Sequence, residues 1–164
     1  MITFQKRRCL ILNTLLFFAF LWCCTPAVSG SSITVERMSL AELKGLMASA
    51  NSRHVIVVMA AWCGPCIKEL PDLVKLFDKY RHKGLNMIGI SIDLEGPNAM
   101  QPYLDKYRVN FPVYWVGEKA VGELNIYGIP MIMLVKNGKV IEKIVGKRSR
   151  KFLDKAIKNF LKGG

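Results

Sequence analysis

Trp62-Cys63-Gly64-Pro65-Cys66 is the stretch that decides how this chain folds. The run just before it is apolar and predicts a buried strand, and the segment just after it has the apolar spacing of a helix. Cys63 is therefore expected where a strand ends and a helix begins. Two cysteines separated only by Gly-Pro can close a small disulfide and open it again.

The expected place of Cys63 gives its sulfur a chemical role. A helix N-terminus carries partial positive charge and N–H groups without partners, and this environment favours a thiolate over a thiol. We therefore expect the pKa of Cys63 to lie below the value of about 8.5 of a free cysteine. At an exposed helix start such a thiolate can attack other disulfides, and Cys66, one turn further in, can resolve the mixed disulfide.

A Cys-x-x-Cys pair can also be half of a zinc site. A closed site would need two more ligands, and outside the leader described below the chain offers His54 and His82. These two histidines do not form a second ligand pair, and we interpret both as solvated surface residues. A Cys-x-x-Cys beside alternating strands and helices favours redox chemistry over zinc binding.

The first 29 residues have the pattern of an export leader. Lys6, Arg7 and Arg8 precede an apolar segment, which is followed by small residues with Ala27 and Ser29 at the cleavage-site spacing. We expect residues 1–29 to be a signal peptide or a membrane anchor and residues 30–164 to form the folded domain.

Lipid attachment is a further alternative for the leader, at Cys23 or Cys24, although Leu21-Trp22 is a poor lipobox. With Cys9, these cysteines all lie in the leader, so the domain keeps only Cys63 and Cys66. A single pair is not a disulfide scaffold. The expected location is periplasmic or extracytoplasmic, with possible anchoring by the N-terminus.

The chain is strongly basic, with 24 Lys and Arg against 12 Asp and Glu and a formal net charge of +12 at pH 7. Many of the cations follow residue 135: Lys136, Lys139, Lys143, Lys147, Arg148, Arg150, Lys151, Lys155, Lys158 and Lys162. A solvated helix and strand face explains them more simply than a surface for an anionic membrane or an acidic partner. Nucleic acid is not expected as a partner, because the chain has no recognition motif for it.

Periodicity and turn residues predict alternating strands and helices. Strands are expected within residues 31–38, 55–60, 85–93, 111–116, 130–135 and 139–145, and helices over 40–50, 64–82, 98–107 and 118–127. A final helix should bury Phe152, Leu153, Ala156, Ile157, Phe160 and Leu161. Ser39 and Glu42 form a capping box, and Asn137-Gly138 indicates a hairpin turn. This order predicts an α/β domain with a central mixed sheet and helices on both faces. We expect the domain to be a monomer.

These residues resemble the thioredoxin superfamily. The resemblance rests on the Trp62–Cys66 run after a strand, on Pro71 in the following helix, and on Ile129-Pro130 where the superfamily has a cis-proline. The run Cys63-x-x-Cys66-x-x-Glu69-x-Pro71, a strand–helix segment at about 93–127 and the leader are similar to the TlpA/ResA branch. The resemblance covers roughly residues 35–164 and implies a thioredoxin fold with the strand–helix insertion of that branch.

The resemblance also implies roles for individual residues. Cys63 and Cys66 are the expected catalytic pair. Glu69 is expected to accept the Cys66 proton, because position 57 is Val where thioredoxins carry a buried Asp; the alternative is an ordinary surface residue. The expected substrate-binding residues are Trp62, Gly64, Pro65, Ile129 and Pro130.

The resemblance further implies a reductant. Its expected substrates are disulfide-bearing exported proteins, with apocytochrome c as one candidate, and its expected electron donor is a membrane thiol reductase of the DsbD or CcdA type. No cofactor or metal is expected beyond the redox-active disulfide.

Other functions stay open. One is a disulfide oxidase or isomerase. A copper chaperone of the Sco type would require a Cys-x-x-x-Cys and a late His, and a peroxiredoxin would require Pro-x-x-x-Thr-x-x-Cys; the chain has none of these. A non-catalytic binding module is disfavoured by the intact cysteine pair.

Overall fold

The computed structural model describes residues 33–49 and 53–163, so the expected leader lies outside the described residues. The described strands are β1 (Glu36–Arg37), β2 (Arg53–Met59), β3 (Asn86–Ser91), β4 (Val113–Trp115), β5 (Met131–Lys136) and β6 (Lys139–Val145). The described α-helices are α2 (Leu40–Ala48), α3 (Gly64–Tyr80), α4 (Gln101–Tyr107), α5 (Lys119–Glu123) and α6 (Arg150–Lys162). Short 3-10 turns cover Arg81–Lys83 and Pro97–Ala99. Within these ranges, no helix has the length and apolar character needed to cross a membrane.

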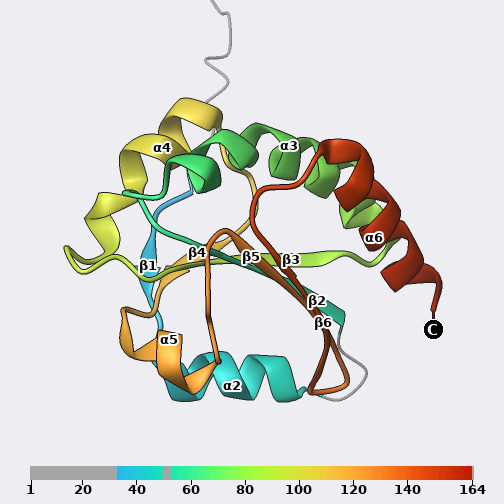
Figure 1. Ribbon diagram of the computed structural model, residues 1–164, viewed down its shortest axis with the longest axis horizontal. Helices are drawn as coiled ribbons and strands as arrows, with labels where there is room; N and C mark the ends of the chain where they lie inside the picture. The colour runs from blue at the N-terminus through green and yellow to red at the C-terminus, as the bar shows by residue number, and fades with distance from the viewer. Residues whose placement is uncertain (1–32, 50–52, 164) are drawn as a thin grey trace, which may run out of the picture. The chain divides into compact units, whose positions relative to one another are not determined.

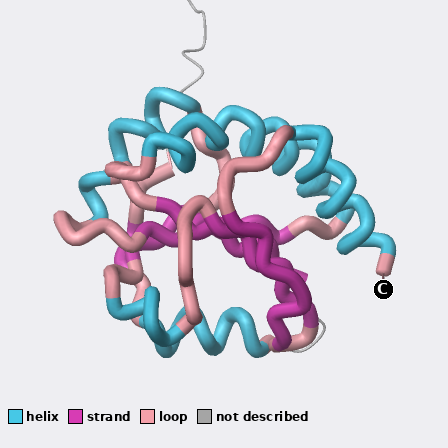
Figure 2. The backbone as a smooth tube through the Cα atoms, viewed as in Figure 1, coloured by secondary structure: helices cyan, strands magenta, loops and turns pink. Residues whose placement is uncertain are grey.

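The strands form one mixed sheet in the order β1-β4-β3-β2-β5-β6. The pairs β1–β4, β4–β3 and β3–β2 are parallel, whereas β5 runs antiparallel to both β2 and β6. Helices α3, α4 and α6 cover one face of the sheet, and α2 and α5 cover the other (Figures 1 and 2). The predicted α/β architecture, with a parallel portion closed by an antiparallel hairpin, is confirmed.

Strand β2 lies at the centre of the sheet and carries the active-site loop at its carboxyl end. It is buried on both faces because β3 and β5 flank it and helices cover both sides; Val55, Ile56 and Val58 are fully buried. His54 belongs to this strand and is only 9% exposed, so its interpretation as a surface histidine is wrong. His82, in the turn after α3, is exposed as predicted.

Local signals account for the ends of two elements. The Ser39 hydroxyl accepts the Glu42 N–H at 3.2 Å, and the Glu42 carboxylate accepts the Ser39 N–H at 2.7 Å, which completes the predicted capping box of α2. Asn137 and Gly138 adopt φ of 49° and 78°, the left-handed pair that a two-residue hairpin turn requires.

Several predicted bounds differ from the structure. Helix α3 ends at Tyr80 rather than near His82, since the chain tightens into a 3-10 turn that closes at Gly84 with φ 83°. Helix α5 ends at Glu123, because the chain leaves the helical region at Leu124 and turns left-handed at Asn125. Phe152 was expected on the buried face of α6 but is 48% exposed, with the Arg148 guanidinium 5.7 Å from its ring centre.

Candidate active site

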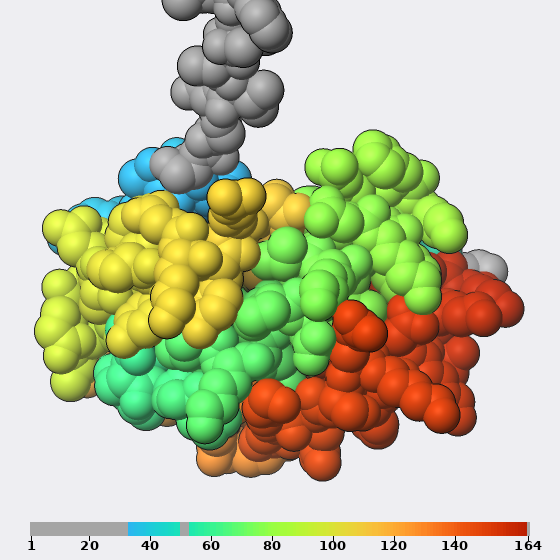
Figure 3. Space-filling view, turned by 90° about the horizontal axis from the view of Figure 1, so that it is seen from above, coloured from blue at the N-terminus to red at the C-terminus, as the bar shows by residue number. Residues whose placement is uncertain are grey.

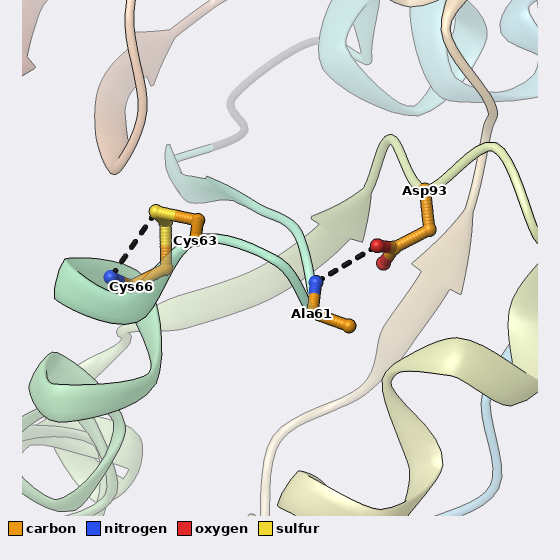
Figure 4. Close-up of a disulfide and its surroundings, with 4 residues drawn as sticks. All are labelled: Ala61, Cys63, Cys66 and Asp93. Atoms are coloured by element: carbon orange, nitrogen blue, oxygen red, sulfur yellow. Dashed lines mark hydrogen bonds between the residues drawn. A yellow bond between two sulfur atoms is a disulfide. The ribbon is translucent and has the colours of Figure 1, made fainter.

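Cys63 and Cys66 form a disulfide at the start of α3, with their Cα atoms 5.2 Å apart. Cys63 is the N-cap of the helix, and its sulfur accepts the Cys66 N–H at 3.2 Å (Figure 4). The strand-to-helix position predicted for Cys63 is confirmed. Because a helix N-terminus favours negative charge, this donor is aimed at the sulfur where a thiolate would form after reduction.

The disulfide is less exposed than the sequence suggested. Cys63 is 5% and Cys66 2% exposed, and both belong to the hydrophobic core cluster. The expectation of an exposed Cys63 is therefore wrong for this oxidised form, in which each sulfur is covered by its partner and by the core. Gly64 and Pro65 are exposed beside the pair, and Trp62 is 63% exposed.

An apolar pocket of about 340 Å³ is lined in part by Trp62, the residue that precedes Cys63. It brings together two predicted substrate-binding residues, Trp62 and Ile129, which come from the loops before Cys63 and before Pro130. The remaining lining residues are Ile92, Leu94, Glu118, Val121, Ile126 and Gly128. The Ile129-Pro130 bond is cis, as the resemblance implied. Trp62 thus belongs to an open apolar surface and not to the core.

Glu69 is a buried carboxyl group one turn beyond Cys66 on α3. It is 1% exposed, so the alternative of an ordinary surface residue is wrong. Its Oε1 accepts the backbone N–H of Arg148 at 2.8 Å. Burial raises the pKa of Glu69 above its ordinary value, and the Arg148 N–H and the charges of Lys147 and Arg148 oppose that rise.

Asp93 is a second buried carboxyl group near the site, and the sequence analysis missed it. It is fully buried just after β3, and its Oδ1 accepts the Ala61 N–H at 2.8 Å (Figure 4). Its Oδ2 accepts the Ser91 hydroxyl at 2.7 Å. Its backbone carbonyl accepts the Trp115 indole N–H at 2.7 Å. Asp93 therefore holds the loop that carries Trp62. Its position at the end of a buried parallel strand was the available signal, because such ends meet at one edge of a sheet.

The fold and the site define a thioredoxin-fold protein with a disulfide-forming Cys-x-x-Cys pair. The family model described as Redoxin matches residues 26–160, and the chain belongs to this family.

Curated relatives of this chain include thiol-disulfide oxidoreductases. Thiol-disulfide oxidoreductase ResA of Bacillus anthracis is 31% identical over 125 residues, which is 75% of this chain and 68% of the relative. ResA of Bacillus cereus is 32% identical over 121 residues, or 73% of this chain and 66% of the relative.

Solved structures share the fold. A crystal structure titled as a thiol:disulfide interchange protein DsbE from Chlorobium tepidum aligns with a TM-score of 0.62 at 25% identity, over 73% of this chain and 84% of that one. StoA from Bacillus subtilis aligns with a TM-score of 0.57 at 17% identity, over 65% and 83% of the two chains, and shows the fold alone. With its Cys63–Cys66 disulfide, this chain is a ResA-like thiol-disulfide oxidoreductase.

Proposed function

We propose that this oxidoreductase works as a reductant of disulfides in exported proteins. The observation that carries the proposal is a closable cysteine pair at the N-terminus of α3, directly preceded by Trp62, which lines the apolar pocket together with Ile129. An extended polypeptide could place its disulfide at Cys63 and an apolar side chain in this pocket. Gly64 and Pro65 are exposed beside the pair and complete the proposed contact surface. Pro130 is buried, so its part in this proposal is limited to the cis bond that places Ile129 at the pocket.

The reaction consists of two exchanges. In the reduced protein the Cys63 thiolate attacks one sulfur of the substrate disulfide, a Cys63–substrate disulfide forms, and the other substrate sulfur leaves as a thiolate. Cys66 then loses its proton and attacks the Cys63 sulfur, which releases the second substrate thiolate and closes the Cys63–Cys66 disulfide. Two electrons pass from the protein to the substrate.

Glu69 is the proposed acceptor of the Cys66 proton. Its burial and raised pKa support this role, because a buried carboxyl whose pKa is moved toward neutrality can both take up and release a proton. The proton reaches Glu69 directly or through one water as Cys66 attacks. Val57 in β2 stands where thioredoxins carry a buried Asp. In this proposal Glu69 takes over the role of that acid as proton acceptor.

The cycle needs an electron donor, because each turnover leaves the protein oxidised. A membrane thiol reductase of the DsbD or CcdA type fits, since it would deliver two electrons and two protons to the Cys63–Cys66 disulfide. This donor places the protein outside the cytoplasm, with residues 1–29 as its signal or anchor. Apocytochrome c is one candidate substrate.

The direction of the reaction can be tested by the reduction potential of the Cys63–Cys66 pair in the full-length chain. Titration against glutathione or dithiothreitol should give a value at or below about −230 mV, in the range of reducing thioredoxins and glutaredoxins. A value above about −180 mV would instead indicate an oxidase or isomerase and would overturn the proposed direction.

Two variants test the order of the exchanges. Cys66→Ser should accumulate mixed disulfides with a substrate, because nothing resolves them, and Cys63→Ser should neither turn over nor form them. Non-reducing gels after incubation with an oxidised peptide separate the two cases. Full turnover by Cys66→Ser would exclude the two-cysteine mechanism.

A further inference from the structure

The segment between β6 and α6 is fixed against both sides of the active site. The Gly146 N–H donates to the carbonyl of the cis-proline Pro130 at 2.8 Å. Two residues later, the Arg148 N–H donates to Oε1 of Glu69 at 2.8 Å. Lys147 lies between these two anchors, so its backbone is held between the proline loop and the helix that carries Cys66.

This segment and the first turn of α6 are cationic. Lys147, Arg148, Arg150 and Lys151 are all exposed, and we call them the cationic rim. The ion pairs found in the described part of the chain involve none of the four. In addition, Arg150 and Lys151 lie in the first turn of α6, which contains no acidic residue and where the helix dipole favours acids. Arg148 packs its guanidinium over the Phe152 ring, but no carboxylate of the described residues forms an ion pair with any of the four, so their charges are open to solvent.

Other charged groups around the disulfide leave this side positive. The charges of Lys147 and Arg148 act on Glu69, as does the opposing carboxylate of Asp72 on α3. Lys68, also on α3, is exposed to solvent. Helix α6, in red, lies alongside α3, in green, on the face seen in Figure 3. The other side of the site is the apolar pocket, whose one charged lining residue is Glu118.

We propose that the cationic rim selects polypeptides that carry acidic residues next to the disulfide to be reduced. The inference rests on the proposed function and adds a substrate class to it. An acidic flank would meet the rim while an apolar residue on the other flank enters the pocket beside Trp62. Opposite charge across such a surface speeds encounter and fixes orientation, and salt weakens the effect.

Three oxidised peptides test this selection. All share one disulfide loop of identical sequence, and their flanking residues are Asp, Ser or Lys. The full-length protein is reduced, desalted and mixed with each peptide, and the peptide thiols formed are counted by alkylation and mass spectrometry. At low ionic strength the Asp peptide should react about tenfold or more faster than the Lys peptide, within the range of electrostatic steering. The ratio should shrink when salt shortens the screening length from about 30 Å to about 8 Å.

A matched pair of charge reversals assigns the effect to the rim. Lys147→Glu should lower the ratio of the two rates by about threefold or more, since it reverses the central charge of the rim. Lys139→Glu makes the same change of net charge at the exposed start of β6, in the β5–β6 hairpin, and should leave the ratio unchanged. The ratio also cancels any change in Cys63 reactivity, because the same thiolate attacks both peptides.

Each other outcome overturns the inference in a distinguishable way. If no peptide is reduced, the proposed function fails and the inference fails with it. If all three peptides are reduced at equal rates, the proposed function stands and the selection does not exist. If Lys147→Glu keeps the ratio but loses binding to phosphatidylglycerol vesicles relative to Lys139→Glu, the rim faces a lipid surface instead of an acidic polypeptide.

Discussion

Glu69 is a carboxyl group inside the protein, and its burial makes the stability of the fold depend on pH. Burial raises its pKa in the folded state, so the folded protein binds this proton more tightly than the unfolded chain does. Protonated Glu69 therefore contributes to the free energy of unfolding. This contribution is fully present below the pKa of the unfolded chain, near 4.3 for a typical Glu, and is lost as the pH rises through the pKa of the folded state.

Glu69→Gln, which cannot ionise, should therefore gain stability relative to the natural protein as the pH rises from 4 to 8. The slope of the difference in unfolding free energy cannot exceed about 1.4 kcal/mol per pH unit, because one proton is involved. Urea unfolding of the two oxidised proteins across this range measures it. Glu142→Gln, which removes a charge at an exposed position of β6, is the control. A constant difference would mean that Glu69 is as easily ionised in the fold as outside it.

Individual buried polar residues were the hardest part of the site to predict. Cys63, Cys66 and Glu69 follow one another within a single motif, so local sequence was enough to propose them as site residues. The role of Asp93 depends on its hydrogen bond to Ala61, which lies 32 positions earlier in the sequence. The two residues come into contact only when β2 and β3 pair. His54 looked like a polar lead-in to a strand, but it is the second residue of β2, pairs with Asn86 and Val135, and has a side chain that is only 9% exposed.

At the scale of elements, the order and type of strands and helices could be predicted, and their ends could not. The apolar periodicity that predicts a strand or helix is spread over the whole element, so one residue that departs from the pattern does not change the prediction. An end depends on a few caps and backbone angles, such as the left-handed Gly84 after α3 and Asn125 after α5. The exposure of Phe152 has the same origin, because it lies in the first turn of α6, where the helix leaves the rim segment.

The hairpin between β5 and β6 allows a test at this scale. Gly138 has φ 78°, and a Cβ there would lie 3.3 Å from the Cα of Ala48. Gly138→Ala should destabilise the protein by about 1–2 kcal/mol, the cost of a left-handed conformation for a residue with a Cβ. The shift of the urea midpoint measures this cost, with no change expected in the Cys63–Cys66 chemistry.

Gly45→Ala is the matched control for this substitution. Gly45 lies inside α2, where an added Cβ meets nothing within 4 Å. Alanine there should stabilise the protein by about 0.5–1 kcal/mol, because glycine is a poor helix residue. If the two variants shifted the midpoint in the same direction, the backbone angle at Gly138 would not be the cause.

At the scale of the whole molecule, the redox direction and the folding stability are linked through four states: folded or unfolded, oxidised or reduced. A reductant holds its disulfide at a lower potential in the folded state than in the unfolded chain. The cycle then requires the oxidised protein to be more stable against unfolding than the reduced one, by about 1.4 kcal/mol for each 30 mV of difference. The burial of Cys63 and Cys66 favours this order, since a thiolate charge is disfavoured in an apolar site.

The oxidised protein should accordingly unfold at a higher urea concentration than the protein kept reduced by dithiothreitol. Cys66→Ser, which cannot form the disulfide, should unfold at the same concentration with and without the reductant, and it controls for effects of dithiothreitol itself. Two features favour the reduced protein instead. The Cys66 N–H donates to the Cys63 sulfur, and the N-terminus of α3 adds positive charge, so both stabilise a thiolate in the reduced form. A reduced protein more stable than the oxidised one would mean that these donors outweigh burial, and the protein would then be an oxidant.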